Sequence, residues 1–463
     1  MKHWTIFLLV LSIVLAACTS TIPVETEKHH VTSTTAGVVS TVAGLKDSTN
    51  TADGIDATKA QLLAPRSVAL EKNGNLLIAA ANKIYRVTVG TGIITTVAGT
   101  DFVGDSGDGG QATSATLRGP QGVCLDSNGN IFIADTANHK IRKVTVSTGL
   151  ITTVAGNGDP LFGGDGDAAT SASLKLPEDV AVDSSGNIFI ADTGNGRIRK
   201  ITAGTGIIMT IAGTSDTSNR YTRTTYEATK FFLIGPTGVA VDTSGNVFIA
   251  GGSDPCILKL TPSTGKLSVV AGIGPYLSGA PYNYNGDDIL ATLAGLDSPT
   301  KVAVDASGNI YISVTEDHRI RKVTALTGRI TTVAGGSSYN YDTEDSISAI
   351  DAWIANPTGV AVDPVGNFYY CDSLAGNVRK VTYSGVASPS VSSSKMPTVV
   401  SAPVTTPAAP PTAGVPTAPS FKTPTAPTST GSQSSSTGHV AQALHMAMIL
   451  LSSILILHLC REA

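Results

Sequence analysis

A repeated unit constrains this chain more than any other feature, because a repeat decides the architecture before any single segment is interpreted. The unit is clearest in two copies, GPQGVCLDSNGNIFIADTANHKIRKVTVSTGLITTVAG at 119–156 and LPEDVAVDSSGNIFIADTGNGRIRKITAGTGIIMTIAG at 176–213. Its leading proline recurs at spacings of 55, 57, 59, 63 and 58 residues, as Pro65, Pro120, Pro177, Pro236, Pro299 and Pro357. The chain therefore contains six units.

Each unit holds four short apolar runs separated by Gly, Asn, Asp and Ser, a pattern typical of strands and turns. We name these runs strands a to d; in the second unit they lie at 122–126, 130–135, 140–145 and 150–156. Four antiparallel strands cannot bury two apolar faces alone, so neighbouring units must stack face to face. The predicted fold is all-β, a six-bladed β-propeller of four-stranded blades.

The sixth unit lacks its strand d. After NVRKVT at 377–382 the chain turns into YSGVASPSVSSSK, whereas a spare copy of the missing run, VVSTVAG, stands at 38–44, before the first unit. We expect this N-terminal strand to complete the last blade, because the ring then closes by hydrogen bonds and leaves no exposed edge strand. The predicted propeller spans residues 38–386.

The six units resemble the NHL-repeat family, whose pattern P.GVAVD..GN.YIAD..NHRI.K they follow over roughly residues 38–382. The resemblance implies a six-bladed propeller. Members of that family include RNA-binding and protein-binding modules, extracellular signalling proteins and a zinc-dependent peptide-amidating lyase. The family thus indicates the fold far more firmly than the function.

The N-terminus, MKHWTIFLLVLSIVLAACTS, predicts a secretory signal peptide over 1–18 with cleavage near Ala17 or Cys18, followed by a linker over 19–37. A membrane helix would need a longer apolar run. The string LAAC also matches a bacterial lipoprotein signal, in which Cys18 would carry the lipid. Both interpretations bring the protein to a cell surface.

Residues 387–438 are rich in Pro, Thr, Ser and Ala, a composition typical of an extended, O-glycosylated stalk. An apolar tail follows over 439–463. Small residues, a polar spacer and this tail together resemble a GPI-attachment signal with candidate lipid attachment at Ser434, Ser435 or Ser436; a single transmembrane helix is the alternative. A C-terminal tail of this kind favours a eukaryotic cell and the extracellular side of its plasma membrane over a bacterial lipoprotein.

Nucleic acid is not an expected partner, because the formal charge is −4 and the basic runs HKIRK, GRIRK and HRIRK alternate with apolar residues in strand c.

An enzymatic function is also disfavoured. The units contain only two histidines, His139 and His318, which is too few for a lyase-type zinc site, and no serine or cysteine nucleophile is visible. Cys124, Cys256 and Cys371 are expected to be small core residues. A channel site built from carboxylates stays open as the alternative.

Carboxylates recur in two slots of the unit. One lies in the a–b turn, where an Asp or Glu precedes x-x-Gly-Asn and is expected to organise the turn. The other ends strand b and coexists with an arginine of strand c. Because a lone buried charge is costly, we predict three structural ion pairs, with Glu316 as a substitute acid for Arg321 in the fifth unit. The pairs are Asp135 with Arg142, Asp192 with Arg199, and Asp372 with Arg379.

Three loops between units, 104–110, 163–167 and 285–288, are rich in Gly and Asp. We expect them to serve as turns without any cofactor. Acids at this spacing could instead hold calcium, although none completes the spacing of an EF-hand loop.

The d–a loops vary in length, with 21, 21, 21, 23, 27 and 22 residues from the closing glycine to the next proline, and they emerge on the same face as the b–c turns. Loops before the last three units carry aromatic residues of the kind that anchor ligands. We predict a ligand-binding face there, formed by Tyr276, Tyr282, Tyr284, Tyr339, Tyr341 and Trp353. The predicted function is a surface-anchored, non-catalytic propeller that binds an extracellular protein or glycan; a secreted hydrolase or lyase with a channel site is the alternative.

Overall fold

The structure of this protein is a computed structural model that describes residues 37–46, 48–51, 53–218, 225–273, 283–336 and 345–383. The predicted signal peptide, stalk and apolar tail, with Cys18 and Ser434 to Ser436, lie outside these residues, as do Tyr276, Tyr282, Tyr339 and Tyr341.

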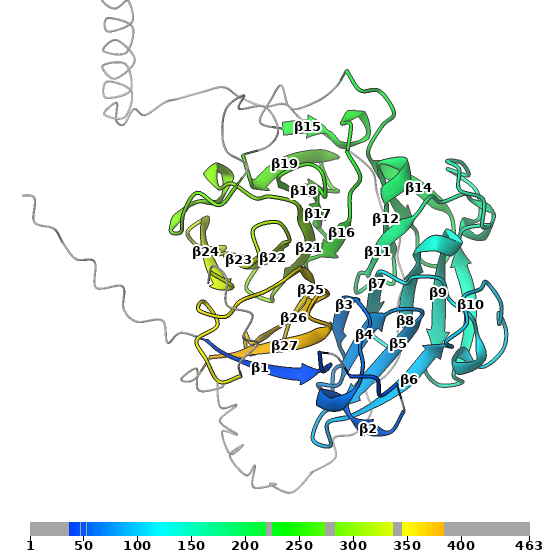
Figure 1. The fold of residues 1–463 in the computed structure, drawn as a ribbon. Helices are drawn as coiled ribbons and strands as arrows, with labels where there is room; N and C mark the ends of the chain where they lie inside the picture. The colour runs from blue at the N-terminus through cyan, green and yellow to red at the C-terminus, as the bar shows by residue number, and fades with distance from the viewer. Residues whose placement is uncertain are drawn as a thin grey trace, which may run out of the picture. The chain divides into compact units, whose positions relative to one another are not determined.

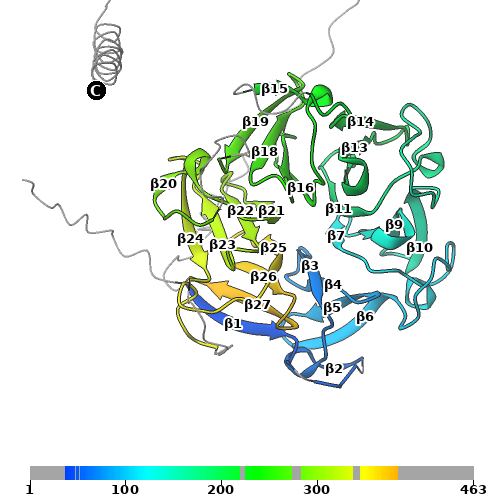
Figure 2. The same ribbon diagram turned by 45° about the horizontal axis from the view of Figure 1, so that its top comes forward.

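The described residues form a six-bladed β-propeller (Figures 1 and 2). Each blade is an antiparallel sheet whose strand a lies nearest the axis and whose strand d is the outer one of the four repeated strands. The strands of blades one to three are β3 (Pro65–Leu70), β4 (Leu76–Ala80), β5 (Lys83–Thr88) and β6 (Ile93–Gly99); β7 (Gly122–Leu125), β8 (Ile131–Asp135), β9 (Lys140–Thr145) and β10 (Leu150–Ala155); β11 (Pro177–Val182), β12 (Ile188–Asp192), β13 (Arg197–Ile201) and β14 (Ile208–Ala212).

Blades four to six have the same order. Their strands are β16 (Gly238–Val241), β17 (Val247–Ala250), β18 (Ile257–Thr261) and β19 (Lys266–Ala271); β21 (Pro299–Val304), β22 (Ile310–Val314), β23 (Arg319–Val323) and β24 (Arg329–Ala334); β25 (Pro357–Val362), β26 (Phe368–Asp372), β27 (Asn377–Thr382) and β1 (Val38–Ala43). The predicted all-β fold is confirmed.

The N-terminal strand completes the last blade, as predicted. β1 pairs with β27 in antiparallel register, with Val38 opposite Thr382 and Ala43 opposite Val378. A register shift between Thr41 and Ala43 repeats the shift between Thr153 and Ala155 in blade two. The joined blade therefore copies a continuous one in detail.

The prediction of four strands per blade was wrong for three of the six blades, which have five strands. In blades one, four and five the preceding d–a loop adds a short outer strand to strand d: β2 (Ile55–Asp56), β15 (Thr225–Glu227) and β20 (Ile289–Leu290). The other three blades make the same contact as single bridges, for example between Gln111 and Leu150. The loop thus covers an edge strand that would otherwise expose unpaired backbone groups.

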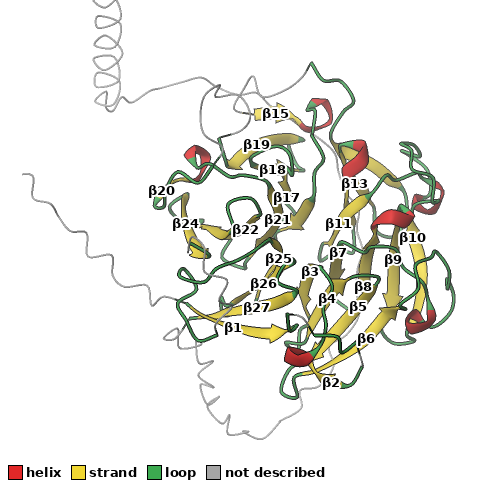
Figure 3. Ribbon diagram, viewed as in Figure 1, coloured by secondary structure: helices red, strands yellow, loops and turns green. Residues whose placement is uncertain are grey.

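Short 3-10 turns follow these edge contacts or end strand b, and they are the only helices in the described ranges (Figure 3). None of them has the length and apolarity to cross a membrane. They are η1 (Ala57–Lys59), η2 (Ala112–Ser114), η3 (Thr136–Asn138), η4 (Ala169–Ser171), η5 (Thr193–Asn195), η6 (Ala228–Lys230) and η7 (Ala291–Leu293).

The core consists of apolar layers between neighbouring blades, one for each adjacent pair of blades in the described ranges. Strand b is buried on both faces, as in the fully buried run Leu76–Ala80. The glycine that closes each unit is needed where strand d passes the b–c turn. At Gly156, φ is +90° and an added Cβ would lie 2.2 Å from the carbonyl oxygen of His139. This close approach explains why every unit that has a strand d ends in glycine.

Candidate functional site

The propeller axis is filled by the third residue of each unit, counted from the leading proline. Small and large residues alternate around the ring, and an added Cβ on Gly122 would lie 2.7 Å from Asp179 Oδ1. The three larger side chains therefore occupy the space that the glycines leave. In blade order the six residues are Ser67, Gly122, Asp179, Gly238, Lys301 and Gly359.

An ion pair crosses the axis between blades three and five. Lys301 Nζ lies 3.1 Å from Asp179 Oδ1, and the two residues are only 8% and 7% exposed. Lys301 also donates to the Glu178 carbonyl at 2.8 Å, while Asp179 accepts the Val239 N–H of blade four at 3.0 Å. Burial raises the pKa of Asp179, and the nearby ammonium opposes that rise. The pair ties three blades together.

A channel of about 300 Å³ begins at this pair and follows the six strands a toward the a–b turns. Its wall at the middle level is small and apolar, with Ala69 and Cys124 from blades one and two. Cys124, placed by the sequence in the core, thus lines the channel, whereas Cys256 and Cys371 are buried. The carboxylate of the channel, Asp179, is engaged by Lys301 and a backbone N–H.

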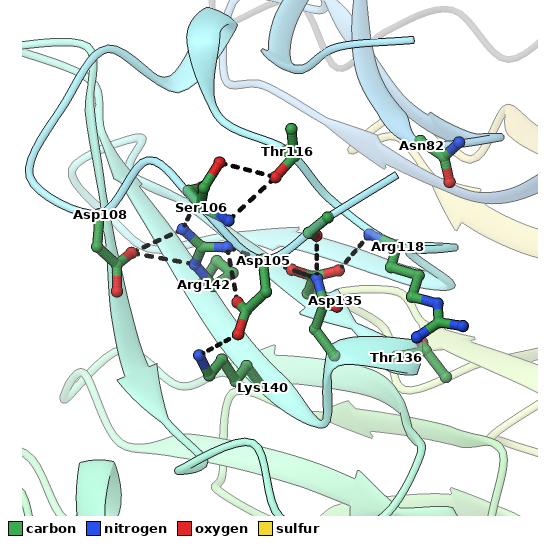
Figure 4. A network of polar contacts seen from close by, with 12 residues as sticks. Asn82, Asp105, Ser106, Asp108, Thr116, Arg118, Asp135, Thr136, Lys140 and Arg142 are labelled. Carbon is green, nitrogen blue, oxygen red and sulfur yellow. Dashed lines mark hydrogen bonds and ion pairs between the residues drawn. The ribbon is translucent and has the colours of Figure 1, made fainter. Parts of the chain in front are cut away.

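The predicted pair in blade two is part of a larger polar network, in which the loop residues Asp105 and Asp108 also contact Arg142 (Figure 4). Arg142 Nη1 lies 3.3 Å from Asp135 Oδ2, and Nη2 lies 2.7 Å from Asp108 Oδ1 in the preceding loop. Asp135 also accepts the Arg118 N–H at 2.7 Å. Burial raises the pKa of Asp135 to about 6, although these partners oppose the rise. Blade three repeats the network, with Arg199 at 3.3 Å from Asp192 and 2.8 Å from Asp165.

In blade six a loop aspartate also binds the strand-c arginine. Arg379 Nη2 lies 3.1 Å from Asp345 of the loop, and the Asp372 carboxylate accepts the N–H groups of Ala355 and Asn356 at 2.8 and 2.9 Å. Burial raises the pKa of Asp372, and Arg379 opposes that rise from nearby. The acid of strand b thus holds the loop backbone, whereas the loop acid holds the arginine.

The suggested substitute acid in blade five was wrong. Arg321 pairs with Asp287 at 3.1 Å and not with Glu316, because the loop aspartate reaches over strand d toward the guanidinium. Asp287 also accepts the N–H and the hydroxyl of Thr332 at 2.7 and 3.0 Å.

The loop aspartate is the residue that sequence reasoning missed, although a simple signal marks it. It stands twelve positions before the leading proline in five units, as Asp53, Asp108, Asp165, Asp287 and Asp345. In blades one, five and six its carboxylate accepts the N–H and the hydroxyl of a strand-d threonine. In blades two, three, five and six it pairs with the strand-c arginine. These Gly-Asp loops therefore act as clamps, and the described residues contain no group of three or more His, Cys, Asp or Glu side chains that could hold a metal ion.

Blade four has Gly251 and Leu258 at the two positions of the pair, yet it keeps the acid's backbone contact. Asp254, from the b–c turn, accepts the Ile234 N–H at 3.1 Å. In blade five Asp317 likewise accepts the Asp297 N–H at 3.3 Å. In both blades the acid lies a few residues later in the chain than Asp135 does in its unit, but it accepts the corresponding loop N–H.

The a–b turn acids organise their turns, as predicted. Asp126 accepts the backbone N–H groups of Asn128 and Asn130 at 2.8 and 2.9 Å and the Asn130 side-chain amide at 2.7 Å. Blade one uses Glu71, which binds the Asn75 amide and Arg86.

The structure describes two members of the predicted aromatic face, Tyr284 and Trp353. Tyr284 is 36% exposed and its ring lies under the guanidinium carbons of Arg319 and Arg321 at 4.1 and 4.9 Å. Phe162 takes the same place in blade three. Trp353 is half-buried. Of the other loop aromatics, Phe231 belongs to the core. The most exposed large apolar residues of this face are instead Phe102 at 77% and Leu161 at 63%, on the loops before blades two and three, and Leu374 at 72%, in the b–c turn of blade six.

The histidines join the b–c turns to the next blade. His139 Nδ1 accepts the Leu176 N–H at 3.1 Å, and burial lowers its pKa, helped by Arg118 and Lys175. His318 Nδ1 lies 2.8 Å from the Ala355 carbonyl oxygen.

With this geometry the repeat can be compared with known families. Residues 117–144 match the NHL repeat. Residues 158–344 match the family model of the Teneurin NHL domain. The resemblance inferred from the six units is thereby supported over a large part of the propeller.

Among curated proteins, the chain is 26% identical over 293 residues to Protein SUPPRESSOR OF QUENCHING 1, chloroplastic, of Arabidopsis thaliana, and 28% identical over 362 residues to Teneurin-m of Drosophila melanogaster. These alignments cover 60% and 72% of this chain but only 27% and 12% of the relatives. The chain thus spans a small part of the relatives it matches.

Among solved structures, an auxiliary nutrient binding protein from Bacteroides thetaiotaomicron is similar to this chain, with a TM-score of 0.54. The superposition covers 75% of this chain and 76% of that protein at 16% identity. The likeness is one of fold.

Proposed function

We propose that this chain is a non-catalytic binding propeller, held at a cell surface on the extracellular side, whose b–c and d–a loops contact an extracellular protein or glycan. The observation that carries the proposal is the difference between the two faces of the ring. The a–b turns repeat one hydrogen-bonded design, whereas the d–a loops differ in length and expose Phe102 and Leu161. Exposed apolar loop residues on a rigid scaffold are typical of binding surfaces.

The path of the chain supports this choice of face. Val38 pairs with Thr382 at the end of the last blade where strand c finishes, and the Tyr383 N–H is bound by Asn367 of the a–b turn. Both ends of the described propeller therefore leave from the a–b side. An anchor at either terminus would leave the opposite face unobstructed.

The Bacteroides protein of similar fold is an auxiliary nutrient binding protein, which supports the proposal that this architecture serves a binding role here. A channel whose carboxylate already binds a lysine and a backbone N–H supports a role without catalysis.

The proposal is tested by presenting the full chain to arrays of extracellular proteins and glycans, with two variants. One carries Phe102→Ser and Leu161→Ser; the other carries Tyr282, Tyr284, Tyr339 and Tyr341 changed to Ser. Leu326→Ser is the matched control, because this residue is 94% exposed in a c–d turn on the opposite face. We expect at least one variant to lose an interaction that the control keeps.

If both folded variants keep every interaction of the parent, the b–c and d–a loops are not the binding surface. Turnover of a lactone or peptide substrate would contradict the non-catalytic role.

We also propose that the Gly-Asp loops at 104–110, 163–167 and 285–288 need no calcium. A chelator should therefore leave the melting temperature of the protein unchanged, and a large drop would assign calcium to these loops.

A further inference from the structure

Blade one breaks a pattern that the other five blades share on the a–b side. In those blades an aromatic residue of strand b lies under a lysine of strand c, at 5.0 to 5.6 Å between the ammonium nitrogen and the ring centre. In blade one the paired positions hold Leu77 and Arg86. Arg86 binds Glu71 at 2.7 Å instead of a ring.

A hollow of about 870 Å³ lies where this pattern is broken, along the a–b turns of blades one to three. It shares Leu70, Leu125 and Val182 with the axial channel, so the two spaces adjoin. Val146 adds a further apolar wall. Its volume lies within the range of roughly 300 to 1,000 Å³ found for ligand sites.

The turns supply polar side chains with spare hydrogen-bonding capacity. Among the described residues, the Asn128 amide and the hydroxyls of Ser127 and Ser184 have no protein partner, although all three line the hollow. Asp126 and Asp183 each accept three hydrogen bonds within their own turns. A carboxylate has about four lone-pair sites, so each keeps about one for a ligand.

The charges of the hollow disfavour a strongly charged ligand. Its lining includes three acids, Glu71, Asp126 and Asp183, and two bases, Lys72 and Arg86. Arg86 is paired with Glu71, and Lys72 donates to the Ser127 carbonyl. A polyanion would face the carboxylates, and a cation would face Lys72 and Arg86.

We propose that this hollow is a second binding site, separate from the b–c and d–a face, and that it binds an uncharged saccharide. Sugar hydroxyls both donate and accept hydrogen bonds, which matches the mixture of amide, hydroxyl and carboxylate groups. The apolar C–H face of a sugar ring fits the floor formed by Leu70, Leu125 and Val146. An open site without a stacking aromatic ring gives weak single-site affinity.

The test uses the full chain on an array of neutral oligosaccharides of glucose, galactose, mannose and N-acetylglucosamine, followed by calorimetry with a sugar that binds. Asn128→Trp fills the hollow from an exposed turn position. Ser307→Trp is the matched control, because Ser307 holds the same turn position in blade five, outside the hollow. We expect Asn128→Trp to weaken binding by at least about tenfold, or 1.4 kcal/mol, and the control to leave it unchanged.

The inference is overturned if no neutral oligosaccharide binds, or if binding survives Asn128→Trp. Loss of sugar binding in the Phe102 and Leu161 variant, with retention in Asn128→Trp, would move the saccharide to the opposite face and would support the proposed function instead. Loss in Asn128→Trp with protein partners retained would support both sites.

Discussion

Blades two and five solve the same packing problem with different residues. In blade two the buried Arg142 has a hydrogen-bond partner for each of its nitrogens, from Asp108, Ser106 and Asp135. In blade five Val314 replaces the strand-b acid, and Nε and Nη1 of the equally buried Arg321 have no hydrogen-bond partner among the described residues. Burial lowers the pKa of Arg321, while Asp287 opposes that change.

The comparison shows that two acids have different roles: one pairs with the arginine, and the other binds the loop backbone. The loop aspartate is present wherever a described blade has the strand-c arginine, so it is the arginine's regular partner. The strand-b acid mainly holds the loop backbone, since Asp317 takes over that contact when Val314 stands in its place. The arginine is kept in blade five, where the strand-b acid alone is missing, and is replaced by Leu258 in blade four, where both acids are missing.

Removing the arginine of a complete network should have the largest effect. Arg199→Met leaves Asp192 buried without its cation, so we expect a loss of about 3–5 kcal/mol in the free energy of unfolding. The double variant with Asp192→Asn should lose less, because no buried charge is left alone. Urea unfolding of both variants measures this, and an equal or smaller loss in the single variant would refute the pairing.

The second test uses pH. Asp135 has a pKa of about 6 in the folded protein, above its ordinary 3.8, so its ionisation opposes folding. Its contribution to the free energy of unfolding is therefore highest below about pH 4 and is lost as the pH rises through 6. Relative to Asp135→Asn, the wild type should lose about 2–3 kcal/mol of unfolding free energy between pH 4 and pH 7.

Urea unfolding across this range gives the difference, and Asp126→Asn is its control. Burial of Asp126 acts to raise its pKa, but the hydrogen bonds from Asn130 and Asn128 outweigh burial and lower it. The wild type should therefore gain stability relative to this control only as the pH rises through the region below 3.8. If the difference in unfolding free energy between the wild type and Asp135→Asn does not change with pH, burial does not raise the pKa of Asp135.

The smallest effect concerns the vacant acid position of blade five. Val314→Asp places a carboxylate in the slot that Asp135 fills in blade two. The substitution costs stability because Val314 belongs to the core, but the cost should be smaller when Arg321 is present than in Arg321→Met. A double-mutant cycle should give a coupling of about 1–2 kcal/mol. Zero coupling would mean that Arg321 cannot turn toward this slot.

Much of the fold follows from local chemistry that a sequence displays directly. The leading prolines set the number of blades, the spare VVSTVAG and the missing strand d set the closure, and Asp126 with its Gly-Asn partner sets the turn. Each of these depends on residues close together in the chain or on a count, so periodicity suffices to predict it.

The site depended on contacts that periodicity does not encode. Asp345 and Arg379 are 34 residues apart and meet only because the d–a loop folds back over strand d. The extra strands β2, β15 and β20 arise for the same reason, since a loop pairs with any edge that would otherwise be exposed.

The axial ion pair shows both what the sequence predicts and what only the tertiary structure decides. The alternation Ser, Gly, Asp, Gly, Lys, Gly is visible once the units are aligned on their prolines. That Asp179 and Lys301 touch was decided by ring closure, which brings strands a of blades three and five to one axis past the glycine of blade four. A sequence states which residues are available, but only the closed ring sets the distance between charges that lie two blades apart.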